Sequence, residues 1–220
     1  ARNAWESCME KYDYESQKKR VAAFNASNSR YKKGLAIQPI CFGISFTNTM
    51  MNHARALVHI YHDGSVVVST GAVEMGQGVN TKMLQIVTET FGIPNHRVRI
   101  ESTNTLRVAN TSPTAASAGA DLNGKALQMA CVALSDRLKA VAQKEYSDAT
   151  IDLKEEKVFA NGVPTDISWN DLVMKAFTQR VALSENSNYS TPTIHYDKTK
   201  EKGHPFAYHV YGTAIHEVTV

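Results

Sequence analysis

Apolar and polar positions along the chain predict both strands and helices. Residues 65–69 (SVVVS) form a strand-like run, and residues 71–78 (GAVEMGQG) form a glycine-rich turn after it. The apolar residues that follow recur at helical spacing, namely Met83, Ile86, Val87 and Phe91. Because glycines allow close backbone approach and the first helical N–H groups lack partners, this succession predicts an anion-binding turn. For this stretch alone, a structural turn before a core helix is the alternative.

The remaining pattern predicts further helices, strands and polar loops. Helices are expected at residues 2–26, after the glycine-rich turn, from Thr114 to about Lys144, and at 169–178 with Ser168 as N-cap. Strands are expected at 34–47, 54–60, 65–69, 98–102 and 206–220, with hairpin turns at Asp63-Gly64 and Asn161-Gly162. Residues 103–113 and 184–202 are expected to be polar loops.

Composition and charge narrow the class of protein. The 220 residues are 43% hydrophobic, which suffices for a core, and the net charge of +3 arises from intermixed acidic and basic residues, which argues against a nucleic-acid partner. The three scattered cysteines, Cys8, Cys41 and Cys131, fit a reducing compartment. Without a membrane-length apolar run or a signal peptide, a cytoplasmic location is expected. The missing initiator Met and the strand-like end (HEVTV) indicate a segment of a longer polypeptide.

Three motifs follow one another along the chain. CFGISFT covers residues 41–47, GAVEMGQGVNTKM covers residues 71–83, and NTSPTAASAGADLNGKA covers residues 110–126. Together they resemble a middle segment of the molybdenum-binding domain of the xanthine dehydrogenase and aldehyde oxidase family. The resemblance implies an α+β fold, with mixed sheets packed against long amphipathic helices. It also implies a division into a helical lead-in (1–33), a cofactor- and substrate-site core (34–144), and a hairpin, helix, loop and returning strand (145–220).

The resemblance implies a molybdopterin cofactor and the residues that hold it. Gln77 matches the glutamine of the family's EMGQG motif, and its amide can pair with the edge of a pterin or with an oxo group. The other expected cofactor-binding residues are Gly76, Gly78, Ala115, Ala116, Ser117 and Gly119. Gly119 departs from the serine that animal members tend to have there. Gln77 and Ala116 are expected near the molybdenum, although the pterin sulfurs hold the metal and no residue ligates it directly. A helix cap is the alternative role for Gln77.

Phe46 and Thr47 are the expected substrate residues, together with the backbone of Ala116. By resemblance, the Phe ring lies against a purine and the Thr hydroxyl bonds a polar edge of it; an aromatic face plus a hydroxyl suits a flat heterocycle. The strands are expected to bring Phe46 and the glycine-rich turn to the same end of a sheet. Because aldehyde oxidases generally lack the FGISFT pattern, its presence favours a purine. Plain core packing of Phe46 is the alternative.

No catalytic residue is expected within the chain. Hydroxylation at molybdenum needs a general base, which the family supplies as a Glu in a GVGEP-like motif that is absent here. Glu74 lies in the glycine-rich turn, but we expect its carboxylate to satisfy backbone N–H groups of that turn. The chain alone is therefore expected to be inactive.

The resemblance implies an oxidoreductase that hydroxylates hypoxanthine or xanthine to urate with oxygen from water. Electrons would pass to [2Fe–2S] clusters and FAD, whose motifs are absent here and are expected in other segments or subunits, with a homodimer as the full assembly. Three alternatives stay open: a family hydroxylase acting on another N-heterocycle or an aldehyde, a non-catalytic module that binds the pterin cofactor, and a structural helix-and-sheet domain without a ligand.

Overall fold

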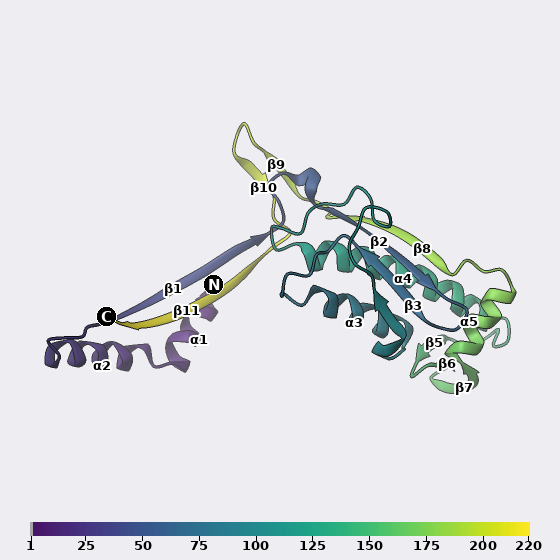
Figure 1. The fold of residues 1–220 in the computed structure, drawn as a ribbon, viewed down its shortest axis with the longest axis horizontal. Coiled ribbons are helices and arrows are strands. Elements are labelled where there is room, and N and C mark those ends of the chain that lie inside the picture. The colour runs from purple at the N-terminus through teal and green to yellow at the C-terminus, as the bar shows by residue number, and fades with distance from the viewer. Residues whose placement is uncertain (1) are drawn as a thin grey trace. The chain divides into compact units, whose positions relative to one another are not determined.

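The computed structural model describes residues 2–220, whose contacts divide them into two units (Figure 1). One unit comprises the chain up to Ile44 together with Phe206–Val220, and the other comprises Ser45–Pro205. The terminal unit contains α1 (Arg2–Lys11), α2 (Tyr14–Ser27), β1 (Lys33–Ile44) and β11 (Tyr208–Thr219). The helices expected within residues 2–26 and the two long strands expected near 34–47 and 206–220 are therefore confirmed.

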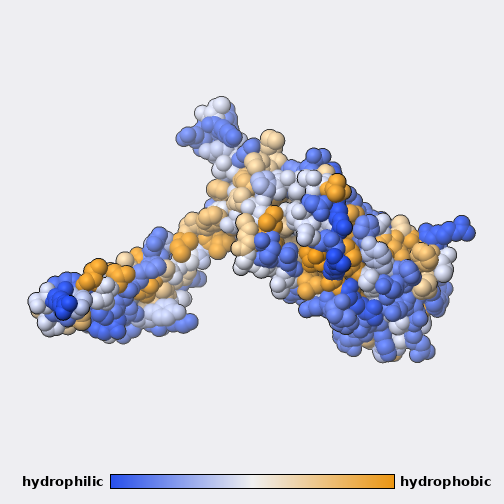
Figure 2. Space-filling model, viewed as in Figure 1, coloured by the Kyte–Doolittle hydropathy of each residue, from blue (hydrophilic) through white to orange (hydrophobic). Residues whose placement is uncertain are grey.

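The terminal unit is a two-stranded antiparallel ribbon covered by helices on one face. β1 and β11 pair along their whole length, from Lys33 opposite Thr219 to Ile44 opposite Tyr208. Lys33 lies over the ring of Phe24 in α2 and also pairs with Glu217 of β11, which marks the face that α2 covers. Alternation sends other side chains to the second face, where hydrophobic residues stay exposed: Ile40, Phe42, Val210 and Val218. Figure 2 shows hydrophobic surface along this ribbon.

The central unit is built on a four-stranded sheet in the order β4-β3-β2-β8, with α3 and α4 against one face (Figure 1). Its elements are β2 (His53–Ile60), β3 (Val66–Thr70), α3 (Val79–Phe91), β4 (Val98–Ile100), α4 (Gly119–Gln143) and β8 (Ser184–Ser190), with short 3-10 helices at Thr49–Met51 and Asn95–Arg97. Residues of β2 alternate between half-buried and buried, so one face packs on the helices and the other faces outward.

A three-stranded antiparallel sheet and one helix complete the central core. The strands are β5 (Ile151–Lys154), β6 (Lys157–Ala160) and β7 (Val163–Ser168), followed by α5 (Trp169–Thr178) and later by the hairpin of β9 (His195–Asp197) and β10 (Lys202–His204). Ser168 is the N-cap of α5, as the sequence predicts, and it forms a capping box with Asp171. The largest fully buried side chains gather in this unit: Trp169, Phe91, Met83, Leu127, Leu134, Leu138 and Leu172.

Two sequence predictions are wrong in detail. The long helix begins at Gly119 and not at Thr114, because Ala116 and Ser117 adopt left-handed backbone angles that end any helical path before it. The expected loop at 184–202 contains β8, β9 and β10, since the polar segment SENSNYS pairs with β2 and packs on α4 in spite of its weak strand propensity. The α+β class with mixed sheets and long helices is confirmed.

No helix described in residues 2–220 has both the length and the apolar character needed to cross a bilayer.

Candidate functional site

The glycine-rich turn between β3 and α3 is held together by the carboxylate of Glu74. One carboxylate oxygen accepts the backbone N–H groups of Gly76 (3.0 Å) and Gly78 (2.9 Å), and the other accepts that of Asn80 (3.0 Å). Gly76 and Gly78 have positive φ angles of 97° and 76°, which residues other than glycine rarely adopt. Hydrogen bonds from Asn80, Gly78 and Gly76 hold the pKa of the Glu74 carboxyl below its ordinary value.

Glu74 is therefore a poor candidate for a general base. Its lowered pKa means a weaker affinity for a proton, and both of its oxygens are already engaged by the turn. The sequence-based expectation that Glu74 satisfies N–H groups of its own turn is confirmed.

A second turn, at residues 114–118, lies against the first. The Val73 N–H donates to the Thr114 hydroxyl at 2.9 Å, which joins the glycine-rich turn to the residues before α4. Behind this contact the two helices approach closely at Gly124, where a Cβ atom would lie 3.0 Å from the Ile86 side chain. The starts of α3 and α4 thus converge on one place, although about forty residues of sequence separate them.

The two turns enclose a cavity of about 490 Å³, a volume typical of small-molecule sites. Four expected cofactor residues line it: Gln77, Ala115, Ser117 and Gly119. The remaining lining residues were not singled out from the sequence, namely Met75, Val79, Lys82, Thr114 and Ala120. Met75 and Lys82 lie inside the motif that contains EMGQG. Their positions relative to the start of the following helix could have indicated them as lining residues.

Gly76, Gly78 and Ala116 belong to the same two turns but are not among the residues that line the cavity. Gln77 lines it while its amide also closes the turn, donating to the Val73 carbonyl (2.8 Å) and accepting from the Met75 N–H (2.6 Å). One amide N–H and one oxygen lone pair of Gln77 stay available to a ligand.

Phe46 and Thr47 lie beside the second turn. The Ser45 N–H donates to the Ala116 carbonyl at 3.4 Å, which places the FGISFT segment next to residues 115–117. Phe46 is half-buried and Thr47 is exposed, and neither lines the cavity between the two turns. Because β2 and β3 are antiparallel, Phe46 precedes β2 at the same end of the sheet at which Gly71 follows β3, as the sequence predicts.

Asn52 holds the backbone of Phe46 in place, a role that the sequence motifs did not indicate. Its side chain accepts the Phe46 N–H at 2.8 Å and donates to the Phe46 carbonyl at 2.9 Å, while the residue is only 2% exposed. A buried amide is easily overlooked because Asn is common in exposed turns.

The chemistry of the cavity fits a polar, anionic cofactor. The N–H groups of Gly119 and Ala120 open α4 and find no acceptor within the described residues, and the exposed residue Lys82, which is positively charged, also lines the cavity. The buried hydroxyls of Thr111 and Ser112, just before Thr114, also have no partner in residues 2–220. Molybdopterin, which carries a phosphate and many hydrogen-bonding atoms, matches such a donor set. Within the same range, no three His, Cys, Asp or Glu side chains gather as a metal site.

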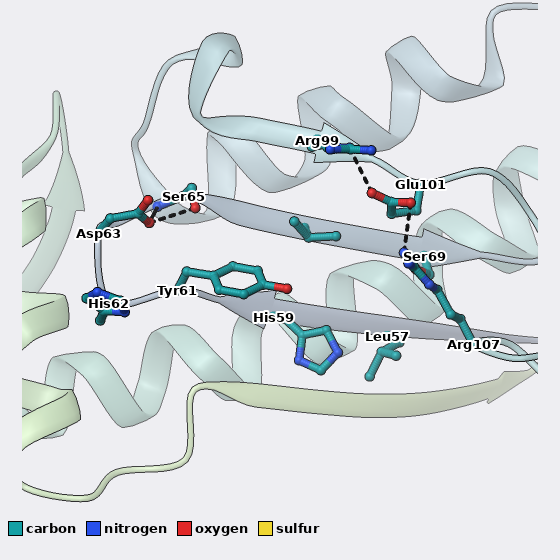
Figure 3. A pocket seen from close by; sticks show the side chains of 11 residues that line it. Leu57, His59, Tyr61, His62, Asp63, Ser65, Ser69, Arg99, Glu101 and Arg107 are labelled. Atoms are coloured by element: carbon teal, nitrogen blue, oxygen red, sulfur yellow. Dashed lines mark hydrogen bonds and ion pairs between the residues drawn. The ribbon is translucent and has the colours of Figure 1, made fainter.

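A second hollow of about 490 Å³ lies on the outward face of the four-stranded sheet (Figure 3). Glu101 pairs there with Arg99 (2.7 Å) and Arg107 (2.8 Å), and at the other end Asp63 accepts from Ser65. None of the expected site residues lines this hollow. Because its carboxylates are already paired, its geometry is that of a structural ion-pair network.

Comparisons with known proteins agree with the geometry. The family described as the molybdopterin cofactor-binding domain matches residues 7–220. Xanthine dehydrogenase/oxidase of Mus musculus is 41% identical over 98% of this chain and 15% of its own length, and aldehyde oxidase 2 of Macaca fascicularis is 39% identical over the same shares. Quinoline 2-oxidoreductase from Pseudomonas putida 86 has a TM-score of 0.82 at 19% identity, over 99% of this chain and 28% of that chain, which shows a shared fold.

The chain thus spans about 15% of the length of the curated relatives that it matches. The family match covers nearly all of the chain, and two of the three motifs that carry the resemblance, at residues 71–83 and 110–126, supply the residues that line one cavity. The chain belongs to the molybdopterin cofactor-binding domains of the xanthine dehydrogenase and aldehyde oxidase family.

Proposed function

We propose that this chain supplies one wall of the cofactor site in a molybdenum hydroxylase that acts on a purine. The observation that supports this proposal is the cavity lined by Gln77, Ala115, Ser117 and Gly119, at the start of two converging helices. Gly76 and Gly78 serve by letting the backbone turn, and Ala116 by placing its backbone beside the FGISFT segment. When bound, the molybdenum cofactor supplies the redox centre for hydroxylation of a ring carbon with oxygen from water.

The residues of this chain bind and orient the reactants. Gln77 and the free amides of α4 hold the cofactor edge, and the half-buried ring of Phe46 offers a flat apolar face to a heterocycle. The exposed Thr47 hydroxyl offers one hydrogen bond that sets the orientation of the ring. Since Glu74 is engaged by the turn, the general base comes from outside these residues.

The proposed enzyme includes further parts beyond this chain. Electrons leave through [2Fe–2S] clusters to FAD, carried by other segments or subunits, and the full assembly is a homodimer. The small share of each relative that the chain matches leaves ample room for these parts.

A second candidate is a family hydroxylase for another N-heterocycle or an aldehyde. It is favoured by the similarity to aldehyde oxidases, which are 36% to 39% identical and thus nearly as similar as the xanthine dehydrogenases. A pterin-binding module without catalysis is the third candidate, and it predicts a bound cofactor without turnover of any of these substrates.

The test uses the intact protein. We expect molybdenum near one per protomer and oxidation of xanthine to urate, with Phe46→Ala and Thr47→Val raising KM for xanthine while the molybdenum content stays unchanged. Faster turnover of an aromatic aldehyde, with xanthine inert, would support the second candidate. A full complement of cofactor without turnover of either substrate would support the third. The 220-residue chain alone should show no purine turnover.

A further inference from the structure

The β9–β10 hairpin carries two histidines at the end of its ladder that lies away from the turn (Figure 1). His195 begins β9 and His204 ends β10, and the two residues are directly opposite each other across the strands. Both are exposed, and their ring centroids lie 5.3 Å apart with an angle of 71° between the ring planes. Within residues 2–220 neither imidazole has a hydrogen bond or an ion pair, so the ring nitrogens are available to a ligand.

Local contacts hold the two strands of this hairpin together. In the turn, the Asp197 carboxylate accepts the N–H groups of Thr199 (2.9 Å) and Lys200 (3.3 Å) and the Thr199 hydroxyl (2.7 Å). Gly203 has a φ angle of 148°, and a Cβ atom there would lie only 2.4 Å from the His195 carbonyl oxygen. Because glycine lacks that atom, the strands can approach each other closely. The two histidines are thus brought together before any ligand binds, which lowers the entropic cost of binding.

The separation of the two rings matches that of two histidine ligands on a tetrahedral metal ion. With a Zn–N bond of about 2.0–2.1 Å, each ring centroid would lie about 3.2 Å from the ion, and a tetrahedral angle places the two centroids about 5.2 Å apart. A 90° angle, as in square-planar copper sites, would place them about 4.5 Å apart. Half a turn about χ2 exchanges the nitrogens and carbons at a ring edge while the centroid barely moves, so the observed separation of 5.3 Å suits zinc.

We propose that His195 and His204 bind one Zn²⁺ ion, with water in the remaining coordination positions. Water completes the coordination because no group of three His, Cys, Asp or Glu side chains gathers within residues 2–220. A bound ion would join β9 to β10 at the end of the ladder that the turn does not hold. Neither histidine lines the cavity between the two turns at residues 71–78 and 114–118, so the zinc site is additional to the proposed function. The basic residues of the hairpin lie at its turn end, beside Asp197: Lys198, Lys200 and Lys202.

The first experiment labels histidines in the wild-type intact protein and so does not depend on the folding of a variant. Diethyl pyrocarbonate modifies free imidazoles, and each site is read by mass spectrometry at pH 7.5 over a series of Zn²⁺ concentrations. Mg²⁺, which prefers oxygen ligands, is the control ion. We expect Zn²⁺ to protect His195 and His204 together and Mg²⁺ to protect neither. His96, an exposed histidine of the 3-10 helix at Asn95–Arg97, should react equally throughout.

The second experiment measures Zn²⁺ binding to the intact protein by equilibrium dialysis. His195→Asn and His204→Asn each remove one ligand from an exposed position, and His96→Asn is the matched control. Because the second imidazole binds the ion intramolecularly, loss of either partner should weaken binding at this site by roughly a hundredfold. We expect the affinity of His96→Asn to equal that of wild type.

The outcomes decide between a zinc site and a simple contact between two rings. Unchanged labelling of both histidines in Zn²⁺, or protection of only one of them, would overturn the site. Equal Zn²⁺ affinity in His195→Asn and wild type would overturn it as well. None of these results bears on the cofactor proposal, because the substituted residues do not line its cavity.

Discussion

The backbone of Phe46 should depend on the buried side chain of Asn52. Asn52→Ala removes the hydrogen bonds of 2.8 Å and 2.9 Å and leaves the Phe46 N–H and carbonyl without partners. A protein hydrogen bond contributes about 0.5–1.5 kcal/mol, so loss of both should weaken the local structure by about 1–3 kcal/mol. Amide exchange of residues 42–52 should then become roughly 5- to 150-fold faster.

Asn52→Asp tests whether the donated bond matters as much as the accepted one. A carboxylate keeps the acceptor for the Phe46 N–H but presents a negative oxygen to the Phe46 carbonyl; a protonated carboxyl can still donate there. Burial raises the pKa of the introduced carboxyl in the folded protein, so stability relative to wild type is retained below the ordinary aspartate value of about 3.9 and is lost as pH rises. The effect should be smaller at pH 4.5 than at pH 7.5.

The assay is hydrogen exchange read by mass spectrometry on the intact protein, with each variant compared with wild type at the same pH. Asn48→Ala is the matched control, because Asn48 begins the neighbouring 3-10 helix without a side-chain capping bond. Wild-type exchange in Asn52→Ala would show that the side chain does not hold this turn. An equal effect of Asn52→Asp at both pH values would refute the importance of the donated bond.

Three further predictions concern the core and the glycine-rich turn. Trp169→Ala should lower the free energy of unfolding by about 3–5 kcal/mol, because it empties a buried site and loses the 2.8 Å bond to the Gly64 carbonyl; a change below 1 kcal/mol in urea unfolding would contradict this. Burial raises the pKa of the Cys131 thiol to about 12, so iodoacetamide should label exposed Cys41 and reach Cys131 only on unfolding. Because its pKa is lowered, Glu74 stabilises the folded turn above about pH 4.3, and exchange at the start of α3 should rise as pH falls below that value.

Local sequence signals predict those elements whose conformation is decided locally. Asn161 and Gly162 have positive φ angles of 50° and 79°, as their hairpin turn requires, and Ser168 caps α5 through its own neighbours. β8 shows the opposite case. Its segment SENSNYS has little preference for a strand, and it becomes one because β2 offers a free edge and α4 covers one face. The residues that impose this strand lie far away in the sequence, because β2 is more than a hundred positions before β8 and α4 ends about forty positions before it.

The candidate site lies between these two cases. The EMGQG turn is local, since glycines and Glu74 close it within a few residues, and sequence reasoning finds it. Its meeting with residues 114–118 depends on the Val73–Thr114 bond and on left-handed angles at Ala116 and Ser117, which an alanine or serine pattern does not indicate. Such angles cost on the order of 1–3 kcal/mol for each non-glycine residue, so the surrounding contacts must impose them. Because this wall of the cavity offers mainly backbone and small side chains, it can serve relatives with different substrates. We propose that discrimination between substrates falls to neighbouring side chains such as Phe46 and Thr47, so their substitution is the most informative test of the purine proposal.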